Sequence, residues 1–422
     1  MRPIRTASLI VTAMAAVAWG LVVAAPPSTA ELDGRDARAI WISQDIGAFD
    51  VAYSPYRRAV YVVGNMPGAE DDVDIFVRRY SVEGQLIWQR LIATDKAEFA
   101  RGVAVDAKGN VVVAGWRNGP NSDDVLLARY SSAGKKLWEK SYDDVFNGAD
   151  RANAVAIDGD GHIWVAGRVP GGTDGSAEIW WSEWNAKGRM LHEWTAQASI
   201  IGWAEAFDVE AKGNTVYLAG SVFETTPDGY VGVYSDAWLG AFSPEGFTRW
   251  ERSWGTPGFD DVARGVEVTS DNQVYATGEV YSTSTGDDIF LRRYTAKGKR
   301  IWSHVLRHPG TDCAGGVTAS RAGAQITLAG TRNCDDFDSD AFLYSTSRRN
   351  IERWRWLSPD DPTHPDRTRT DAGLAITSGG NLFVAGRQTP NQAALLTTWP
   401  WLMDMSTSGA HQPWSTIFNP VP

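Results

Sequence analysis

Short apolar stretches separated by glycine turns recur along most of the chain. In the clearest copy, apolar residues at 100–106 lead through a Lys-Gly-Asn turn into a second apolar stretch at 111–115, which ends in Ala-Gly. A third stretch covers 124–130 and ends in Tyr, and a fourth follows a glycine and contains Trp138. The repeated segments hold no helical period, so each unit predicts four short antiparallel strands.

The glycine that closes the second stretch gives the period of the repeat. Its positions are Gly64, Gly115, Gly167, Gly220, Gly278, Gly330 and Gly386. The intervals of 51, 52, 53, 58, 52 and 56 residues match the length of one four-stranded propeller blade with its loops. We therefore predict an all-β fold, a seven-bladed β-propeller of four-stranded antiparallel blades that is closed by the chain termini.

Side-chain size changes along each unit in the way that a propeller requires. Radially packed blades converge at the axis and diverge at the rim, so the residues should become larger from the first strand to the fourth. The first stretches contain Gly102, Ala104, Ala154, Ala156, Gly265, Gly316 and Gly373, and the fourth contain Trp88, Trp138, Trp250, Trp302 and Trp354. We interpret these tryptophans as core between blades, rather than as a ligand platform. His192 replaces the outer tryptophan in the third unit, and Asn350 replaces the turn glycine in the sixth.

The residues of the repeat resemble those of a known family of repeats. The unit Ala-Arg-Gly-Val-Ala-Val-Asp at 100–106, with Gly-Asn-Val-Val-Val-Ala-Gly, Asp-Val-Leu-Leu-Ala-Arg-Tyr and Gly-Lys-Lys-Leu-Trp after it, resembles the bacterial β-propeller repeat called SBBP. It is similar, more distantly, to NHL-type propellers. The resemblance covers roughly residues 40–415 and implies an exported or cell-surface propeller, in a family without a common catalytic signature.

The N-terminus has the pattern of an export signal. Arg2 and Arg5 precede an apolar run at 7–25, and Ser-Thr-Ala closes the segment at residue 30. We predict that residues 1–30 are a cleaved signal peptide and that 31–422 form the propeller, with an uncleaved membrane anchor as the alternative. After cleavage we expect no transmembrane domain, a monomer, and a secreted, periplasmic or cell-surface location.

Two segments compete for the strand that closes the ring. Residues 39–43 read as an isolated strand ahead of the first unit, and residues 411–415 read as another after the last. Either one could complete the seventh blade and leave no open sheet edge.

The chain has only two cysteines, Cys313 and Cys334. One precedes the first strand of the sixth unit and the other follows its second strand, so antiparallel pairing around a turn at 321–324 would bring them together. Export would supply an oxidising compartment. We predict a structural disulfide, rather than a redox or metal site.

A formal net charge of −11 disfavours nucleic acid as a partner, because an acidic surface repels phosphates. Cations or basic ligands suit this charge better. Acids just before the third strand recur at Asp74, Asp124, Glu178, Asp236, Asp288 and Asp340, and this regularity favours a structural role in holding loop N–H groups. Calcium is the alternative at Asp336, Asp338 and Asp340, whose spacing suits oxygen ligands. No other cofactor is expected.

A ligand site is expected where the chain enters the first strands, around the channel mouth. The positions that align with Arg101 are Phe49, Asn153, Glu205, Arg264, Gly315 and Ala372. Arg101, Asn153, Glu205 and Arg264, with Trp203 beside them, form the candidate ligand-binding set. The alternative is that these residues pair with one another and bind nothing. Two long loops at 221–235 and 359–370 would overhang the same face.

The sequence favours a non-catalytic binding or scaffold module for a protein, peptide or glycan, because common hydrolase and metalloprotease motifs are absent from it. The alternative is a propeller enzyme. One version is a lyase or hydrolase that uses Arg101, Glu205, Arg264 and His364. The other is a quinoprotein-like dehydrogenase, since Gly-Lys-Lys-Leu-Trp is similar to the docking motif of those propellers. That family has eight blades and adjacent cysteines, whereas this chain has seven units and separated cysteines.

Overall fold

The computed structural model describes residues 37–41, 47–68, 72–144, 146, 148–171, 176–196, 203–225, 231–320, 323–334, 339–357, 367–369, 374–376, 382–389 and 399–405. The regular elements in these ranges are β-strands. The predicted signal peptide, residues 1–30, lies outside them. Within the described ranges, no helix has the length and apolar character needed to cross a bilayer.

Six four-stranded antiparallel sheets form the blades of a β-propeller. The first three are β2 (Gly47–Ser54), β3 (Ala59–Pro67), β4 (Val73–Ser81) and β5 (Leu86–Ile92); β6 (Glu98–Val105), β7 (Val111–Asn118), β8 (Asp123–Tyr130) and β9 (Lys136–Tyr142); and β10 (Arg151–Ile157), β11 (Ile163–Pro170), β12 (Ala177–Trp184) and β13 (Met190–Ala196). The next three are β14 (Ala204–Lys212), β15 (Thr215–Thr225), β16 (Val231–Phe242) and β17 (Thr248–Trp254); β18 (Val262–Val268), β19 (Val274–Ser282), β20 (Gly286–Tyr294) and β21 (Arg300–Leu306); and β22 (Cys313–Ala319), β23 (Ile326–Arg332), β24 (Asp340–Thr346) and β25 (Glu352–Leu357).

The prediction of seven four-stranded blades is wrong, because the described residues form six four-stranded sheets. The other strands, β1 (Ala37–Trp41), β26 (Arg367–Arg369), β27 (Leu374–Ile376), β28 (Leu382–Thr389) and β29 (Trp399–Met405), form one five-stranded sheet. Gly386 lies in β28, a second strand like those of the other six glycines. The repeat glycine therefore marks the presence of a second strand, and it does not show that the unit also has one continuous first strand. In this sheet two short strands, β26 and β27, pair with β28 in place of a single first strand.

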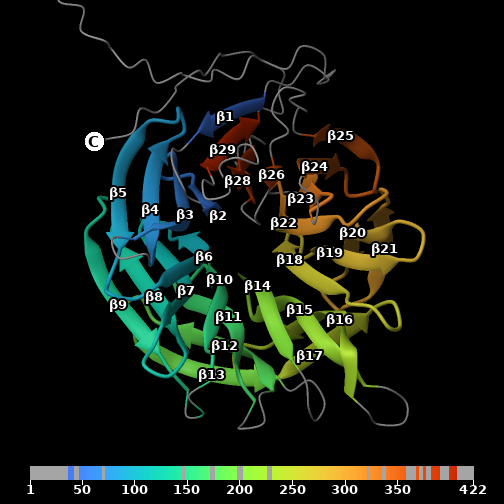
Figure 1. Cartoon of the computed structure of the whole chain (residues 1–422), viewed down its shortest axis with the longest axis horizontal. Helices are drawn as coiled ribbons and strands as arrows, with labels where there is room; N and C mark the ends of the chain where they lie inside the picture. The colour runs from blue at the N-terminus through green and yellow to red at the C-terminus, as the bar shows by residue number, and fades with distance from the viewer. Residues whose placement is uncertain are drawn as a thin grey trace, which may run out of the picture. The chain divides into compact units, whose positions relative to one another are not determined.

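The first strands of neighbouring blades lie side by side nearest the centre of the propeller (Figure 1). β2 contacts β6, β6 contacts β10, and the series continues through β14 and β18 to β22. β22 in turn contacts β27, and both β27 and β28 contact β2. The five-stranded sheet thus links the sixth blade to the first.

The N-terminal strand belongs to this linking sheet. β1 pairs with β29 in antiparallel register, from Ala37 opposite Met405 to Trp41 opposite Trp401. Of the two segments predicted to compete for the closing place, the N-terminal one is therefore paired, although residues 42–43 of it lie outside the described ranges. The competing segment, 411–415, also lies outside them.

A β-bulge explains the repeated glycine. In each blade the register between the first and second strands shifts at one place, as between Ala100 and Gly102 in β6. The shift turns a backbone carbonyl under the glycine, so a Cβ on Gly115 would lie 1.9 Å from the Phe99 oxygen. The equivalent carbonyls, at 1.9–2.7 Å from such a Cβ, belong to Gly47, Arg151, Glu205, Val262 and Cys313. Only glycine fits where a bulge brings the backbone this close.

The outer tryptophans join each blade to the next, as the sequence predicts. Trp88 is 8% exposed and its indole N–H donates to the Ser132 carbonyl at 3.0 Å. The same bond, at 2.9–3.1 Å, is made by Trp138 to Ala186, Trp250 to Ala296 and Trp302 to Arg348. In the third blade Trp194, two residues after His192, donates to Glu245 at 3.1 Å and takes this role. Asn350 has a φ of 59°, so it adopts the left-handed conformation of the glycine it replaces.

The predicted disulfide is present. Cys313 and Cys334 are bonded, with Cα atoms 5.8 Å apart. Cys313 lies opposite Thr331 in the strand register, not opposite Cys334. A turn after β23, in which Asn333 has a φ of 50°, brings Cys334 back so that its N–H donates to Thr311 at 2.8 Å. The bridge therefore joins the two strand ends at the bulged side of the sixth blade.

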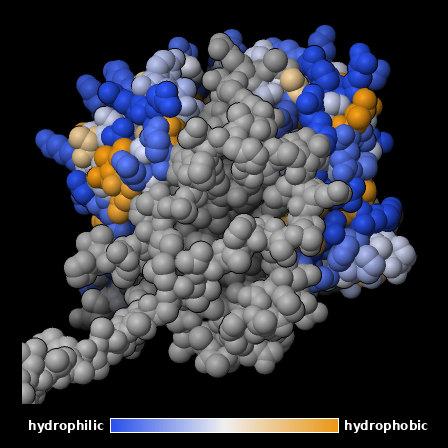
Figure 2. Space-filling model, turned by 90° about the horizontal axis from the view of Figure 1, so that it is seen from above, coloured by the Kyte–Doolittle hydropathy of each residue, from blue (hydrophilic) through white to orange (hydrophobic). Residues whose placement is uncertain are grey.

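The outer surface does not by itself mark a ligand face. Figure 2 shows hydrophilic residues over most of the described part of one side, with small separate hydrophobic patches between them. Large exposed apolar side chains on the outer strands are Ile87, Leu91, Leu137, Ile301 and Leu357. Single apolar residues of this kind are normal on protein surfaces, so the bulged ends of the first strands are the better place to look.

Candidate functional site

The bulges place one side chain from each of the first five blades at the same level of the first strands. These residues are Phe49, Arg101, Asn153, Phe207 and Arg264, and we call them the bulge belt. The sixth blade has Gly315 and Gly316 at this place. A bulge re-aims a side chain out of the alternating pattern of its strand, so the belt is a set of variable side chains on a repeated backbone.

The predicted alignment of Glu205 with Arg101 is wrong. The register shift in β14 lies between Ala206 and Asp208, so Phe207 holds the bulge position. Ala204 and Ala206 are two residues apart, and the sequence therefore offered two alignments to the Ala-Arg pair at 100–101. Glu205 nevertheless stays beside the belt through the contacts described below.

Arg101 lies in an alternating stack of guanidinium groups and aromatic rings. Its Cζ lies 4.9 Å from the ring centroid of Phe49 and 4.8 Å from that of Trp116. Arg151 lies 4.7 Å from the same Trp116 ring and is paired with the Asp123 carboxylate. Such stacking holds an arginine in one orientation. Arg101 is exposed, so this stack lies at the surface.

Asn153, Glu205 and Trp203 meet around a buried arginine. The Asn153 amide donates to Glu205 Oε1 at 2.7 Å and to the Ala206 carbonyl at 2.8 Å. Arg168 Nε lies 3.6 Å from the same Glu205 oxygen, and its Cζ lies 4.3 Å from the Trp203 ring. Burial lowers the pKa of Arg168, and the Glu205 carboxylate opposes that shift. Trp203 is 48% exposed, so about half of this residue faces solvent.

Arg264 makes the third group of contacts. Its Cζ lies 4.4 Å from the Phe207 ring, and its Nε lies 3.1 Å from Glu279 Oε2. Glu279 also accepts the Ala314 N–H of the next blade at 2.7 Å. The belt residues are therefore held by neighbours in both their own blade and the adjacent one, and a pre-arranged surface of this kind loses little entropy on binding.

Sequence reasoning missed the residues that support the belt. Trp116, Arg168 and Glu279 each follow a repeat glycine, at Gly115, Gly167 and Gly278. That adjacency was the available signal, because the glycine marks where the second strand passes the bulge. Arg151 and Phe207 had no such marker.

Two half-buried aspartates lie one residue beyond the belt. Asp50 accepts the Val51 N–H and the Val103 N–H of the next blade, both at 2.8 Å. Asp208 accepts Val209 and Val266 in the same way at 2.8 Å. Burial raises the pKa of Asp50 to about 8 and that of Asp208 to about 7, while the backbone donors act in the opposite direction. These carboxyl groups fasten one first strand to the next.

Two glutamates occupy the first strands farther along. Burial raises the pKa of Glu210 to about 7, and the Lys212 ammonium opposes this. Burial also raises the pKa of Glu267 well above its usual value, and the charge of Glu210 adds to the effect. Taking a carboxyl group out of water disfavours its charged form, which is the cause of both shifts.

A second set of acids, also missed, lies three residues before the bulge. Glu98, Asp150, Asp261 and Asp312 are each at most 2% exposed. Asp261, for example, accepts the backbone N–H groups of Thr256 and Tyr281. Burial raises the pKa of Asp150 to about 8, of Asp312 to about 7 and of Asp261 to about 6. The spacing to the bulge residue could have shown them.

The acids predicted before the third strand differ in their surroundings. Asp74 and Asp288 are buried, and Asp288 accepts the Thr285 hydroxyl at 2.8 Å and the His308 N–H at 3.2 Å, as a loop-holding residue would. Of the candidate calcium ligands, Asp336 and Asp338 lie outside the described residues, while Asp340 begins β24. Among described residues, no group of three or more Asp, Glu, His or Cys is arranged to hold a metal. His364 is also outside the described ranges.

Comparison with known proteins gives a likeness of architecture. No family model matches the chain, and no curated protein matches it in sequence. Among solved structures, the chain is similar to the β-propeller domain of the Trilobed protease from Pyrococcus furiosus, which is described as having an open velcro topology. The two share 11% sequence identity at a TM-score of 0.47, over 90% of this chain and 99% of that domain.

Proposed function

We propose that this propeller is an exported, non-catalytic binding module that holds a glycan on the bulge belt. The observation that carries the proposal is the belt itself, in which a backbone feature repeated in every blade presents Phe, Arg or Asn in the first five blades and glycine in the sixth. A role in the fold alone would not need this variety. Export is supported by the disulfide between Cys313 and Cys334 and by the SBBP-like repeat.

The chemistry of the belt suits sugars. Sugar rings present apolar C–H faces that pack on aromatic rings, and hydroxyl groups that both donate and accept hydrogen bonds. The rings of Phe49 and Phe207 in the belt, and the half-exposed Trp203 beside it, suit the apolar sugar faces. The paired polar groups of Asn153, Glu205 and Arg168 offer fixed donors and acceptors for the sugar hydroxyl groups.

The proposal is tested by calorimetric titration of the purified protein with soluble oligosaccharides of cellulose, chitin, mannan and pectin. Trp203→Ala should weaken the binding of the best ligand at least tenfold, as removal of a central aromatic anchor does. The matched control is Tyr56→Ala. Tyr56 is 75% exposed in the β2–β3 turn, at the other end of the strands. Equal loss in both variants, or binding of an acidic peptide but no oligosaccharide, would refute a glycan site on the belt.

An enzyme that works at the same place is the second candidate, and one observation favours it. Burial raises the pKa of Glu210 to about 7 and that of Glu267 well above its usual value, and shifted carboxyl groups of this kind gather at catalytic sites. The titrated mixtures should therefore also be examined by mass spectrometry for cleaved sugars. Cleavage that disappears in Glu210→Gln would favour a hydrolase or lyase over a binding module.

A further inference from the structure

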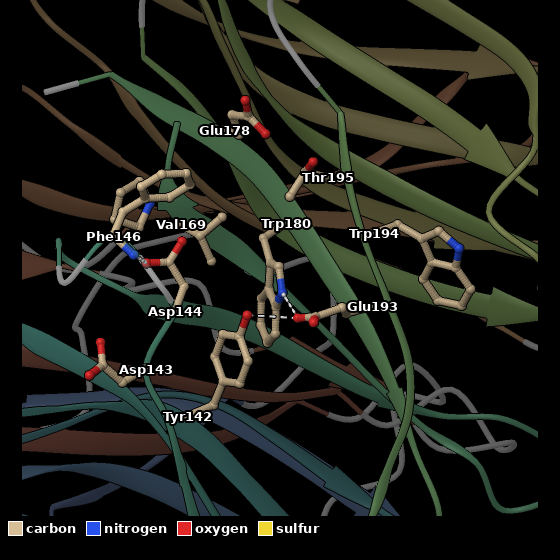
Figure 3. Close-up of a pocket in the computed structure, with 11 residues that line it drawn as sticks. Tyr142, Asp143, Asp144, Phe146, Val169, Glu178, Trp180, Glu193, Trp194 and Thr195 are labelled. Carbon is tan, nitrogen blue, oxygen red and sulfur yellow. Dashed lines mark hydrogen bonds between the residues drawn. The ribbon is translucent and has the colours of Figure 1, made fainter. Parts of the chain in front are cut away.

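A pocket lies between the second and third blades, and its lining shares no residue with the bulge belt. Its volume is about 440 Å³, within the range of small-ligand sites. The walls come from the end of β9, the segment after it, and the edges of β11, β12 and β13. Figure 3 shows the side chains around it.

The floor of the pocket is aromatic and fixed. The rings of Tyr142 and Trp180 stack with centroids 5.2 Å apart and planes at 20°, and Trp180 is 1% exposed. Their polar atoms converge on one carboxylate: Glu193 Oε2 accepts the Tyr142 hydroxyl at 2.7 Å and the Trp180 indole N–H at 3.3 Å (Figure 3). Glu193 is thereby held at the edge of the aromatic floor without a cationic partner among the lining residues.

The walls of the pocket are acidic. Asp143, Asp144 and Glu178 line it together with Glu193, and none of the eleven lining residues is Lys, Arg or His. Beneath them, the fully buried Asp150 carboxyl accepts the Asp144 N–H at 3.2 Å. Its pKa is raised to about 8 by burial, and the charges of Asp144 and Asp143 add to the shift. The pocket therefore has a strongly negative potential next to an apolar surface.

We propose that this pocket binds an organic cation, an alkylammonium or guanidinium group with its hydrocarbon stem. The stem would lie along Phe146 and the aromatic floor, and the charged head would face Glu193 and the wall carboxylates. A bare metal ion fits less well, because no three acidic residues in the described part of the chain are close enough to share one, and aromatic rings supply no ligands to it.

The source of the cation is either a lysine or arginine side chain of another polypeptide or a free amine. Both present the same chemistry to the pocket, so both are tested by probes that differ only in what is attached to the charged head. Binding is followed by calorimetry, with the intrinsic tryptophan fluorescence of the whole protein as a second readout.

The probes are N-acetyl-lysine amide, N-acetyl-arginine amide and the uncharged N-acetyl-norleucine amide, together with the peptide Gly-Gly-Lys-Gly-Gly and the free diamine putrescine. The charged probes should bind, norleucine amide should bind at least tenfold more weakly, and affinity should fall as salt rises. Tighter binding of the peptide assigns the site to a polypeptide partner, and tighter binding of putrescine assigns it to a free amine. Equal binding of norleucine amide, or no binding of any cation, overturns the proposal.

Variants locate the binding. Glu193→Gln removes the charge but keeps an acceptor for Tyr142 and Trp180, and it should lower the affinity for the charged probes about tenfold. Glu251→Gln is the matched control, because Glu251 has the same register position in β17 that Glu193 has in β13 and does not line the pocket. Asp143→Asn, at an exposed wall residue, gives a second test that does not touch the floor. If Glu193→Gln and Asp143→Asn bind like Glu251→Gln, the cation sits elsewhere.

Discussion

The rim of this propeller, where the outer tryptophans lie, repeats its side chains from blade to blade, whereas the bulge belt repeats only its backbone. At the rim, five blades make the same junction, in which an indole N–H donates to a turn carbonyl of the following blade. At the belt, the backbone repeats but the side chains are Phe, Arg, Asn, Phe and Arg. The positions whose identity is constant from blade to blade hold the fold together.

The positions that vary on a fixed backbone are free to serve another purpose. Arg101 and Arg264 both stack on a phenylalanine, and Arg264 is also paired with Glu279. Asn153 meets Glu205 instead. This difference is why we place the ligand at the belt and not at the rim, and the following substitutions test whether the division between fold and function holds.

The largest effect should come from the repeat glycine that allows the bulge. In Gly115→Ala the new Cβ would lie 1.9 Å from the Phe99 carbonyl oxygen, so the backbone must move. We expect a loss of on the order of 4 kcal/mol in the free energy of unfolding, because overpacking against backbone has no flexible side chain to absorb it. The measurement is the urea midpoint and Tm of the purified variant.

The control for that substitution is Gly159→Ala. Gly159 lies in the β10–β11 turn, and a Cβ placed on it meets nothing within 4 Å. This variant should unfold within a few tenths of a kcal/mol of the parent protein. Similar losses at both glycines would mean that the bulge contact is not what the repeat preserves.

The next effect concerns the sixth blade, which has no belt side chain. Its bulge is Gly315 and Gly316, and a disulfide fastens the strand ends there instead. Replacing Cys313 and Cys334 together by alanine opens a loop of 21 residues and should cost about 3 kcal/mol. Thermal unfolding of the double variant should match that of the parent protein in reductant. An unchanged Tm in both would show that the blade does not depend on the bridge.

The sequence predicts the strands well because their signals are local. Alternating apolar residues, turn glycines and the outer tryptophans all act within one unit, and β2 to β25 follow them. The predicted number of blades was wrong because Gly386 marks only a second strand. Whether a first strand pairs along its full length depends on contacts with the neighbouring blade, which no pattern inside the unit reports.

The candidate site was predicted in part for a related reason. Arg101, Asn153 and Arg264 hold bulge positions, but the alignment chose Glu205 over Phe207. A bulge adds one residue to a strand, and the two candidate positions, Glu205 and Phe207, are two residues apart, so both fit the same side-chain alternation. A single sequence does not show where that extra residue lies, because Ala204 and Ala206 fit the repeat equally.

The position after the bulge shows two solutions to one packing problem. Gly102 and Gly265 bring the next first strand close, since a Cβ on them would lie 3.0 Å from the Val155 nitrogen and 3.2 Å from the Val317 nitrogen. In the first and fourth blades Asp50 and Asp208 stand at this position and bind the equivalent N–H with a carboxyl oxygen. Only the aspartate junctions carry a titrating group, so pH should distinguish them.

The smallest effect is therefore a change in pH dependence at Asp50. Its pKa in the folded protein is about 8 against an ordinary value of 3.8, so the folded state binds more protons between these values. The resulting stability is complete below about pH 4 and is lost as the pH rises through 8. Asp50→Asn cannot titrate, so its Tm should fall less than that of the parent protein between pH 5 and pH 8.5. The lost acceptor should lower its Tm equally at every pH.

The control is Asp95→Asn, at an exposed turn residue, which should keep the pH dependence of Tm of the parent protein. Equal slopes in all three proteins would mean that Asp50 stays charged and holds Val103 as a carboxylate throughout.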